Sequence, residues 1–85
     1  MRKIAHYEAV CAEIIRLLRE ERKRRKLSNY AVSQQSGVSE SMLSLVDRSL
    51  RNPSMELMLR IADGMEVDLP AIIKKAQATV SKTGK

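Results

Sequence analysis

The chain has 85 residues, a net charge of +6, two aromatic residues and a single cysteine. A chain of this size forms one domain with one modest core, here built from aliphatic side chains and methionine. A lone cysteine excludes an internal disulfide, and no segment approaches the roughly 18 apolar residues needed to span a bilayer. We expect a cytoplasmic protein, because the first ten residues lack the apolar segment of a signal peptide and one unpaired thiol suits a reducing compartment.

The first predicted element is a long helix over residues 4–25. Apolar residues recur with helical spacing at Tyr7, Val10, Cys11, Ile14 and Leu18, and Ile15 and Leu17 widen the stripe. Seven basic residues crowd its end: Arg16, Arg19, Arg22, Lys23, Arg24, Arg25 and Lys26. Such a cluster favours an anionic partner, with nucleic acid as the first choice and an anionic membrane surface as the second. The alternative is a solvated helix face that has no partner.

Two short helices follow. Ser28 is a good N-cap for a helix that ends at residue 36, and Gly37 stands where a left-handed residue ends a helix. Ser39 is the next N-cap, and Glu40 lies in the first turn, where the helix dipole favours an anion. The third helix ends near Asp47 or Arg48, with Leu43 and Val46 facing inward.

The remaining chain predicts two further helices. Ser54 caps the fourth, whose inward stripe is expected to be Met55, Met58, Ile61, Ala62 and Met65. Gly64 is expected to weaken this helix near its end. Asp68 caps the fifth helix, and Pro70 lies in its first turn. We expect one domain over residues 1–78 and a flexible polar tail over 79–85.

Two short helices joined by a glycine turn are typical of a helix-turn-helix, here over about residues 28–48. In DNA-binding examples the second helix enters the major groove. The outward positions Glu40, Ser41, Ser44 and Arg48 are all polar, as base and phosphate contacts require. Glycine-turn helix pairs also occur in folds that never contact DNA, so the pair alone leaves both possibilities open.

Residues 14–73 resemble the lambda-repressor-like family, also called the Cro-like or xenobiotic-response-element (XRE) family. The matching positions are Arg22, Leu27-Ser28, Gly37-Val38-Ser39, Asp47, Arg51-Asn52-Pro53-Ser54-Met55-Glu56, Ile61-Ala62, Met65 and Val67. The resemblance implies an all-α, five-helix DNA-binding domain, here with an extended first helix.

The resemblance also implies roles for individual residues. Base reading falls on Glu40, Ser41, Ser44 and Leu45. Phosphate binding falls on Asn29, Arg48, Arg51 and Asn52. A structural ion pair joins Arg22 to Asp47.

Three departures from the family pattern bear on these roles. The family's usual glutamate is Asp47, which is one methylene shorter, so the ion pair either uses a water or fails. Ser49 replaces the usual glycine after that acid. Leu45 stands where many members carry a polar reading side chain, so it either contacts a thymine methyl or only packs. Glu40 either accepts a hydrogen bond from cytosine N4 or serves only the helix dipole.

The sequence therefore predicts a sequence-specific, repressor-like transcriptional regulator that binds double-stranded DNA. We expect a homodimer, joined through the last helix (Leu69, Ile73, Ala76) or the first (Tyr7, Val10), unless these surfaces pack within one subunit. The alternative is a protein-interaction module, or an antitoxin-type subunit, with weak or no independent DNA binding and a toxin or other regulator as partner. We expect no enzymatic activity, cofactor or metal, because the chain has one histidine, one cysteine and no glycine-rich phosphate loop.

Overall fold

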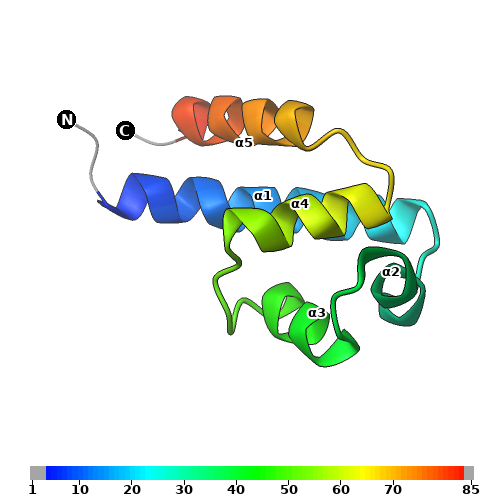
Figure 1. The fold of residues 1–85 in the computed structure, drawn as a ribbon. Coiled ribbons are helices and arrows are strands. Elements are labelled where there is room, and N and C mark those ends of the chain that lie inside the picture. The colour runs from blue at the N-terminus through cyan, green and yellow to red at the C-terminus, as the bar shows by residue number, and fades with distance from the viewer. Residues whose placement is uncertain (1–3, 84–85) are drawn as a thin grey trace.

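The computed structural model describes residues 4–83, and these form an all-α domain of five helices. The helices are α1 (Ile4–Arg24), α2 (Asn29–Ser36), α3 (Glu40–Asp47), α4 (Met55–Gly64) and α5 (Leu69–Thr83). α5 runs back along α1, so both ends of the described chain lie on the same side of the molecule (Figure 1). α2 packs on α3 and α4, and α3 also contacts α1. Within residues 4–83 no helix is long and apolar enough to cross a bilayer.

Side-chain oxygens cap the starts of four helices, as the sequence predicts. The hydroxyls of Ser28, Ser39 and Ser54 accept hydrogen bonds from backbone N–H groups three residues later, at 3.0–3.1 Å. Asp68 Oδ1 accepts the same kind of bond from Ala71 at 3.4 Å. These caps fix where α2 to α5 begin, because they satisfy N–H groups that have no partner within the helix.

One aliphatic core joins all five helices. Val32, 1% exposed, lies at its centre, and Ala76 of α5 is fully buried. Most of the predicted inward positions are confirmed as members of this core, which contains Val10, Ile14, Leu17, Leu18, Val32, Val38, Leu43, Met58, Ile61, Ala62, Met65, Leu69 and Ala76.

Two predicted stripe residues are instead exposed. Met55 is 53% exposed, because it lies at the edge of the buried stripe of α4, on the side of Leu59, which is itself 52% exposed. Tyr7 is 55% exposed and makes an edge-to-face contact with His6 rather than with the core. Both predictions of burial were wrong, since helical spacing identifies the face of a helix but not the edge of the surface that covers it.

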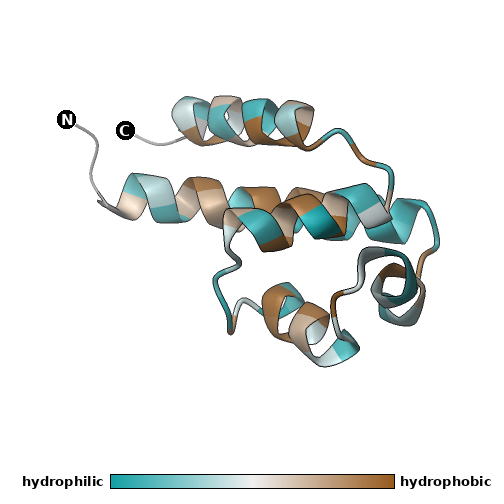
Figure 2. Cartoon of the chain, viewed as in Figure 1, coloured by the Kyte–Doolittle hydropathy of each residue, from teal (hydrophilic) through white to brown (hydrophobic). Residues whose placement is uncertain are grey.

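α5 extends further than the sequence suggested and packs against α1. The helix continues to Thr83, into the segment predicted as a tail, because Val80 is half-buried against the core. In Figure 2 the hydrophobic residues of α5 lie on the edge that faces α1. Leu69 and Ala76 on α5 are buried, as is Val10 on α1. The two surfaces proposed for dimerisation therefore largely cover each other within one chain.

Three helices end in the same left-handed turn without glycine. Lys26, Ser49 and Glu66 have φ of 57°, 58° and 57°. After α3, Leu50 N–H bonds to Leu45 O at 2.9 Å and Ser49 N–H to Val46 O at 3.0 Å, which is the Schellman pattern. α2 ends on Gly37 at φ 77°. Of these four positions, the sequence identified only Gly37 as left-handed, because the other three residues carry side chains that disfavour this conformation.

Gly64 serves the contact between α4 and α2 rather than merely weakening α4. A Cβ atom at this position would lie 2.8 Å from the Cβ of Ser36 and 3.0 Å from its backbone nitrogen. Any side chain at this position would force Ser36 to shift. Glycine therefore lets the end of α2 approach α4, and this contact sets where Gly37 turns the chain.

Many arginines of the basic cluster are engaged within the protein. Arg24 and Arg25 both pair with Glu21, and Arg25 Nη1 donates to Met65 O at 2.9 Å, which ties α1 to the end of α4. Hydrogen bonds from Arg24, which has the larger effect, and from Arg25 lower the pKa of Glu21 to about 2. Arg16 pairs with Glu13 and Glu20. The charge of the cluster is thus partly neutralised by neighbours.

We predict that Ser49→Gly raises the free energy of unfolding by about 0.5–1 kcal/mol, because glycine adopts a left-handed backbone without the steric cost that serine bears. Urea denaturation monitored by circular dichroism measures the change. The opposite change is Gly37→Ala, which adds a side chain at a left-handed position and should lower the free energy of unfolding by about 1 kcal/mol. Its added Cβ meets nothing nearer than Arg60 Nη1 at 3.9 Å, so the loss reports backbone strain. A destabilised Ser49→Gly protein would contradict this assignment.

We predict that the Glu21 cluster contributes stability that disappears in acid. The pKa of Glu21 is about 2 in the folded chain against 4.5 ordinarily, so its contribution is complete above pH 4.5 and is lost as the pH falls to about 2. Glu21→Gln should lower the free energy of unfolding by at most about 1 kcal/mol at pH 7 and by nothing at pH 2. The control is Glu8→Gln, since exposed Glu8 has no ion pair within residues 4–83. A loss of unfolding free energy in Glu21→Gln that is the same at pH 7 and pH 2 would refute the contribution assigned to the Glu21 ion pairs.

Candidate nucleic-acid interface

The turn between α2 and α3 has the geometry of a helix-turn-helix. Gly37 takes the left-handed conformation, and its N–H bonds to Ser33 O at 3.0 Å. Val38 is 6% exposed and fills the space between the two helices. The hydroxyl of Ser36 accepts a hydrogen bond from Val38 N–H at 3.1 Å. The turn is therefore held by both its backbone and its apolar plug, and α3 leaves it in a fixed direction.

α3 buries one side and leaves the other open. Leu43 and Val46 are each 4% exposed and anchor the helix to the core. Glu40 and Ser41 are exposed at the opposite side, in the first turn. Ser44 and Leu45 are half-buried and continue that side toward the end of the helix. α3 therefore presents a mostly polar edge to solvent along its whole length.

An open groove of about 550 Å³ runs along this edge of α3. It contains every residue predicted to read bases and two of those predicted to bind phosphate. Its lining is Asn29, Glu40, Ser41, Ser44, Leu45 and Arg48. Leu45 is the one apolar member, positioned to contact a base methyl group or to pack against its neighbours. The roles of these residues stay predictions, but the fold brings them together on one surface.

The other two predicted phosphate-binding residues lie elsewhere. Arg51 and Asn52 are exposed in the loop after α3 and line a second groove of about 400 Å³. Its opposite wall comes from α1 and includes Tyr7, Glu8 and half-buried Cys11. The extension of α1 therefore stands beside the predicted phosphate-binding loop, an arrangement that the sequence did not suggest.

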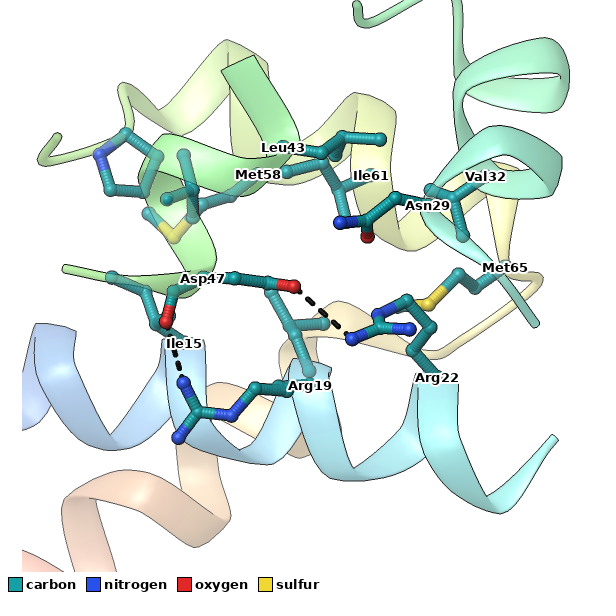
Figure 3. Close-up of a pocket in the computed structure, with 13 residues that line it drawn as sticks. Ile15, Arg19, Arg22, Asn29, Val32, Leu43, Asp47, Met58, Ile61 and Met65 are labelled. Carbon is teal, nitrogen blue, oxygen red and sulfur yellow. Dashed lines mark hydrogen bonds and ion pairs between the residues drawn. The ribbon is translucent and has the colours of Figure 1, made fainter. Parts of the chain in front are cut away.

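Asp47 is held by two arginines of α1, one on its side chain and one on its backbone (Figure 3). Arg22 Nη2 lies 3.2 Å from Asp47 Oδ2, so the shorter acid reaches the arginine without a bridging water. Arg19 Nη1 donates to the backbone oxygen of Asp47 at 2.6 Å. Sequence reasoning missed Arg19, although it precedes Arg22 by three residues and therefore shares its helix face.

A small cavity of about 20 Å³ lies behind the ion pair, among residues of α1, α2, α3 and α4. Figure 3 shows the carboxamide of Asn29 pointing into this cavity, towards Arg22 and Asp47. Arg22 Nη1 donates to Leu27 O at 2.9 Å, whereas its buried Nε has no partner within residues 4–83. Asn29 lines both this cavity and the outer groove, so its side chain stands between the core and the predicted DNA-facing surface.

Among the arginines of residues 4–83, those without an internal partner lie at the end of α3 and in the loop after it, rather than along α1. Within residues 4–83 the side chains of Arg48 and Arg51 form neither an ion pair nor a hydrogen bond, and both are exposed. Exposed cations without internal partners are the ones available to phosphates. The single acid of the groove, Glu40, lies at the start of α3 and Arg48 at its end, so a polyanion is favoured at the loop side.

No cluster of metal-ligating side chains occurs in the part of the chain that the structure describes. Residues 18–72 match the family model described as helix-turn-helix. Comparisons with curated proteins and with solved structures gave no match. The match covers α2, α3 and α4 together with Arg19 and Arg22 of α1, so the family core contains the whole groove along α3. The chain therefore belongs to the helix-turn-helix family of the XRE and Cro/C1 type, a lambda-repressor-like family of DNA-binding regulators.

Proposed function

We propose that the protein is a sequence-specific, repressor-like transcriptional regulator that reads the DNA major groove with α3. The observation that carries this proposal is the open polar edge of α3, with Glu40 and Ser41 exposed while Leu43 and Val46 anchor the helix. A helix held from behind and open in front is the geometry that major-groove recognition requires.

The groove along α3 suggests a division of labour between base edges and phosphates. Ser41 and Ser44 offer hydroxyls that both donate and accept, Glu40 offers an acceptor for cytosine N4, and Leu45 an apolar surface for a thymine methyl. Arg48 and Arg51 supply the phosphate contacts, which position the protein without reading sequence. Asn52 extends the phosphate surface along the loop, and Asn29 does so at the start of α2.

We further propose that the protein acts as a homodimer on a two-fold site, because one small module buries little DNA surface. The interface needs exposed apolar residues, and buried Leu69 and Ala76 do not supply them. The large hydrophobic side chains that remain exposed within residues 4–83 are Tyr7, Tyr30, Leu50, Met55 and Leu59. The loop after α3 and the outer side of α4 therefore replace α5 as the surface that we favour.

The second candidate is a protein-interaction module or antitoxin-type subunit with weak or no independent DNA binding. The observation in its favour is that the groove is lined by one acidic residue, Glu40, one basic residue, Arg48, and the apolar Leu45, so its net charge is not strongly positive. A toxin or another regulator would be the partner. The two candidates differ in whether the isolated chain binds duplex DNA with the salt dependence of phosphate neutralisation.

We predict that the isolated protein shifts a random duplex in a mobility-shift titration, and that the affinity falls steeply between low and physiological salt. Selection from a random duplex pool should then yield a palindromic consensus, with half-sites about one helical turn apart. The expected consensus establishes sequence specificity and two-fold binding together. Absence of salt-dependent binding would exclude a DNA-binding regulator and leave the interaction module.

We predict that Arg51→Ala weakens binding to every duplex alike and lowers the slope of log affinity against log salt by about 1. Ser41→Ala should instead change preference at one base position, because Ser41 lies on the reading edge of α3. Arg16→Ala is the charge-matched control for Arg51→Ala. Arg16 bonds to Glu13 and Glu20 on α1 and does not line the α3 groove. Uniform loss in both Arg51→Ala and Ser41→Ala would show that the reading edge is misplaced.

A further inference from the structure

We infer that Arg19 is a positioning residue that sets which bases the C-terminal half of α3 reads, an inference that rests on the proposed function. Its Nη1 atom donates to the backbone oxygen of Asp47, the last residue of α3, at 2.6 Å. The bond crosses from the last third of α1 to the end of α3. Arg19 itself does not line the groove along α3, so it acts on recognition only through Asp47.

The end of α3 requires such a partner. The last carbonyls of a helix have no N–H partners within it. After α3, the turn uses the oxygens of Ser44, Leu45 and Val46 as acceptors. The oxygen of Asp47 accepts none of these backbone bonds and receives the guanidinium of Arg19 instead. A cation at this end of the helix also opposes the negative end of its dipole.

The two arginines hold different parts of the same residue. Arg22 binds the carboxylate of Asp47. This ion pair alone would let the backbone move, because the side-chain bonds of Asp47 can rotate. Arg19 grips the backbone itself and so fixes the last turn against α1. Arg48 follows directly, and its N–H bonds to Ser44 O at 3.0 Å within that turn. The placement of Arg48 therefore depends on the Arg19 contact.

The start of α3 is held by other means. Ser39 caps it at 3.1 Å, and buried Val38 anchors the turn that precedes it. Loss of the Arg19 contact should therefore loosen the end of α3 and leave its first turn in place. Leu45 and Arg48, which line the later half of the groove, should lose their register on DNA, whereas Ser41 should keep it.

The test compares Arg19→Met with Arg19→Lys and with Arg24→Met. Methionine keeps much of the apolar stem and removes every donor, while lysine retains one charged donor. Arg24→Met makes the same chemical change on the same helix at an exposed residue whose guanidinium, within residues 4–83, bonds only to Glu21. Each protein is examined for melting temperature, for binding to the selected duplex and to random duplex, and for base preference by selection.

We expect Arg19→Met to lose roughly tenfold in the ratio of specific to random affinity relative to Arg24→Met, which corresponds to about 1.4 kcal/mol. Preference should relax at the base facing Leu45 and persist at the position that Ser41→Ala alters. Arg19→Lys should recover most of the ratio. Equal ratios and preferences in the two methionine variants would overturn the inference, even if Arg19→Met melts at a lower temperature, because Arg19 would then be only structural.

Hydrogen exchange separates this inference from the proposed function. The amides of Arg48, Ser49 and Leu50 close the turn after α3 and should exchange roughly tenfold faster in Arg19→Met than in Arg24→Met. Unchanged exchange would overturn the positioning role whether or not DNA is bound. A wild-type chain that prefers no sequence would refute the proposed regulator and with it the reading role of Arg19, while faster exchange would still establish that Arg19 holds the turn.

Discussion

The attachment of α3 to α1 through Asp47 is the contact on which the orientation of α3 depends. A helix of eight residues is too short to be stable by itself. Leu43 and Val46 fix its depth in the core, yet apolar packing is not directional and does not set its angle. Charged hydrogen bonds from Arg19 and Arg22 to a single residue supply that direction. The ion pair alone would hold a flexible side chain, whereas the added bond to the backbone holds the helix.

This arrangement changes the meaning of the basic cluster. A run of arginines near a helix-turn-helix invites an electrostatic interpretation, with each charge directed at a phosphate. In the folded chain Arg19 and Arg22 orient α3, and Arg25 links α1 to the end of α4. Among residues 4–83, the exposed and unpaired guanidiniums belong to Arg48 and Arg51, at the end of α3 and in the loop after it. The same residue type thus has two uses, which burial and hydrogen bonding separate and composition does not.

Close approach of backbones gives the second constraint. Gly64 has no Cβ, so the end of α2 rests against α4, and Gly37 can then turn the chain into α3. Three other helix ends, at Lys26, Ser49 and Glu66, adopt the left-handed turn without glycine. Their backbone hydrogen bonds outweigh a local steric cost of about 1–2 kcal/mol each. The chain therefore stores some strain at its helix ends while its tertiary contacts stay intact.

Local sequence determined the helices, their serine caps and the turn at Gly37, because these depend on residues within one or two turns of each other. It also determined the family, whose motif is a set of spacings, and most of the core face of each helix. Tertiary structure alone decided that Tyr7 and Met55 are exposed and that α5 covers α1. It also decided that Arg19 binds the backbone oxygen of Asp47, 28 residues away in the chain. Periodicity states which side of a helix is apolar, but what covers that side, and which charges find partners across it, depends on where the other helices lie.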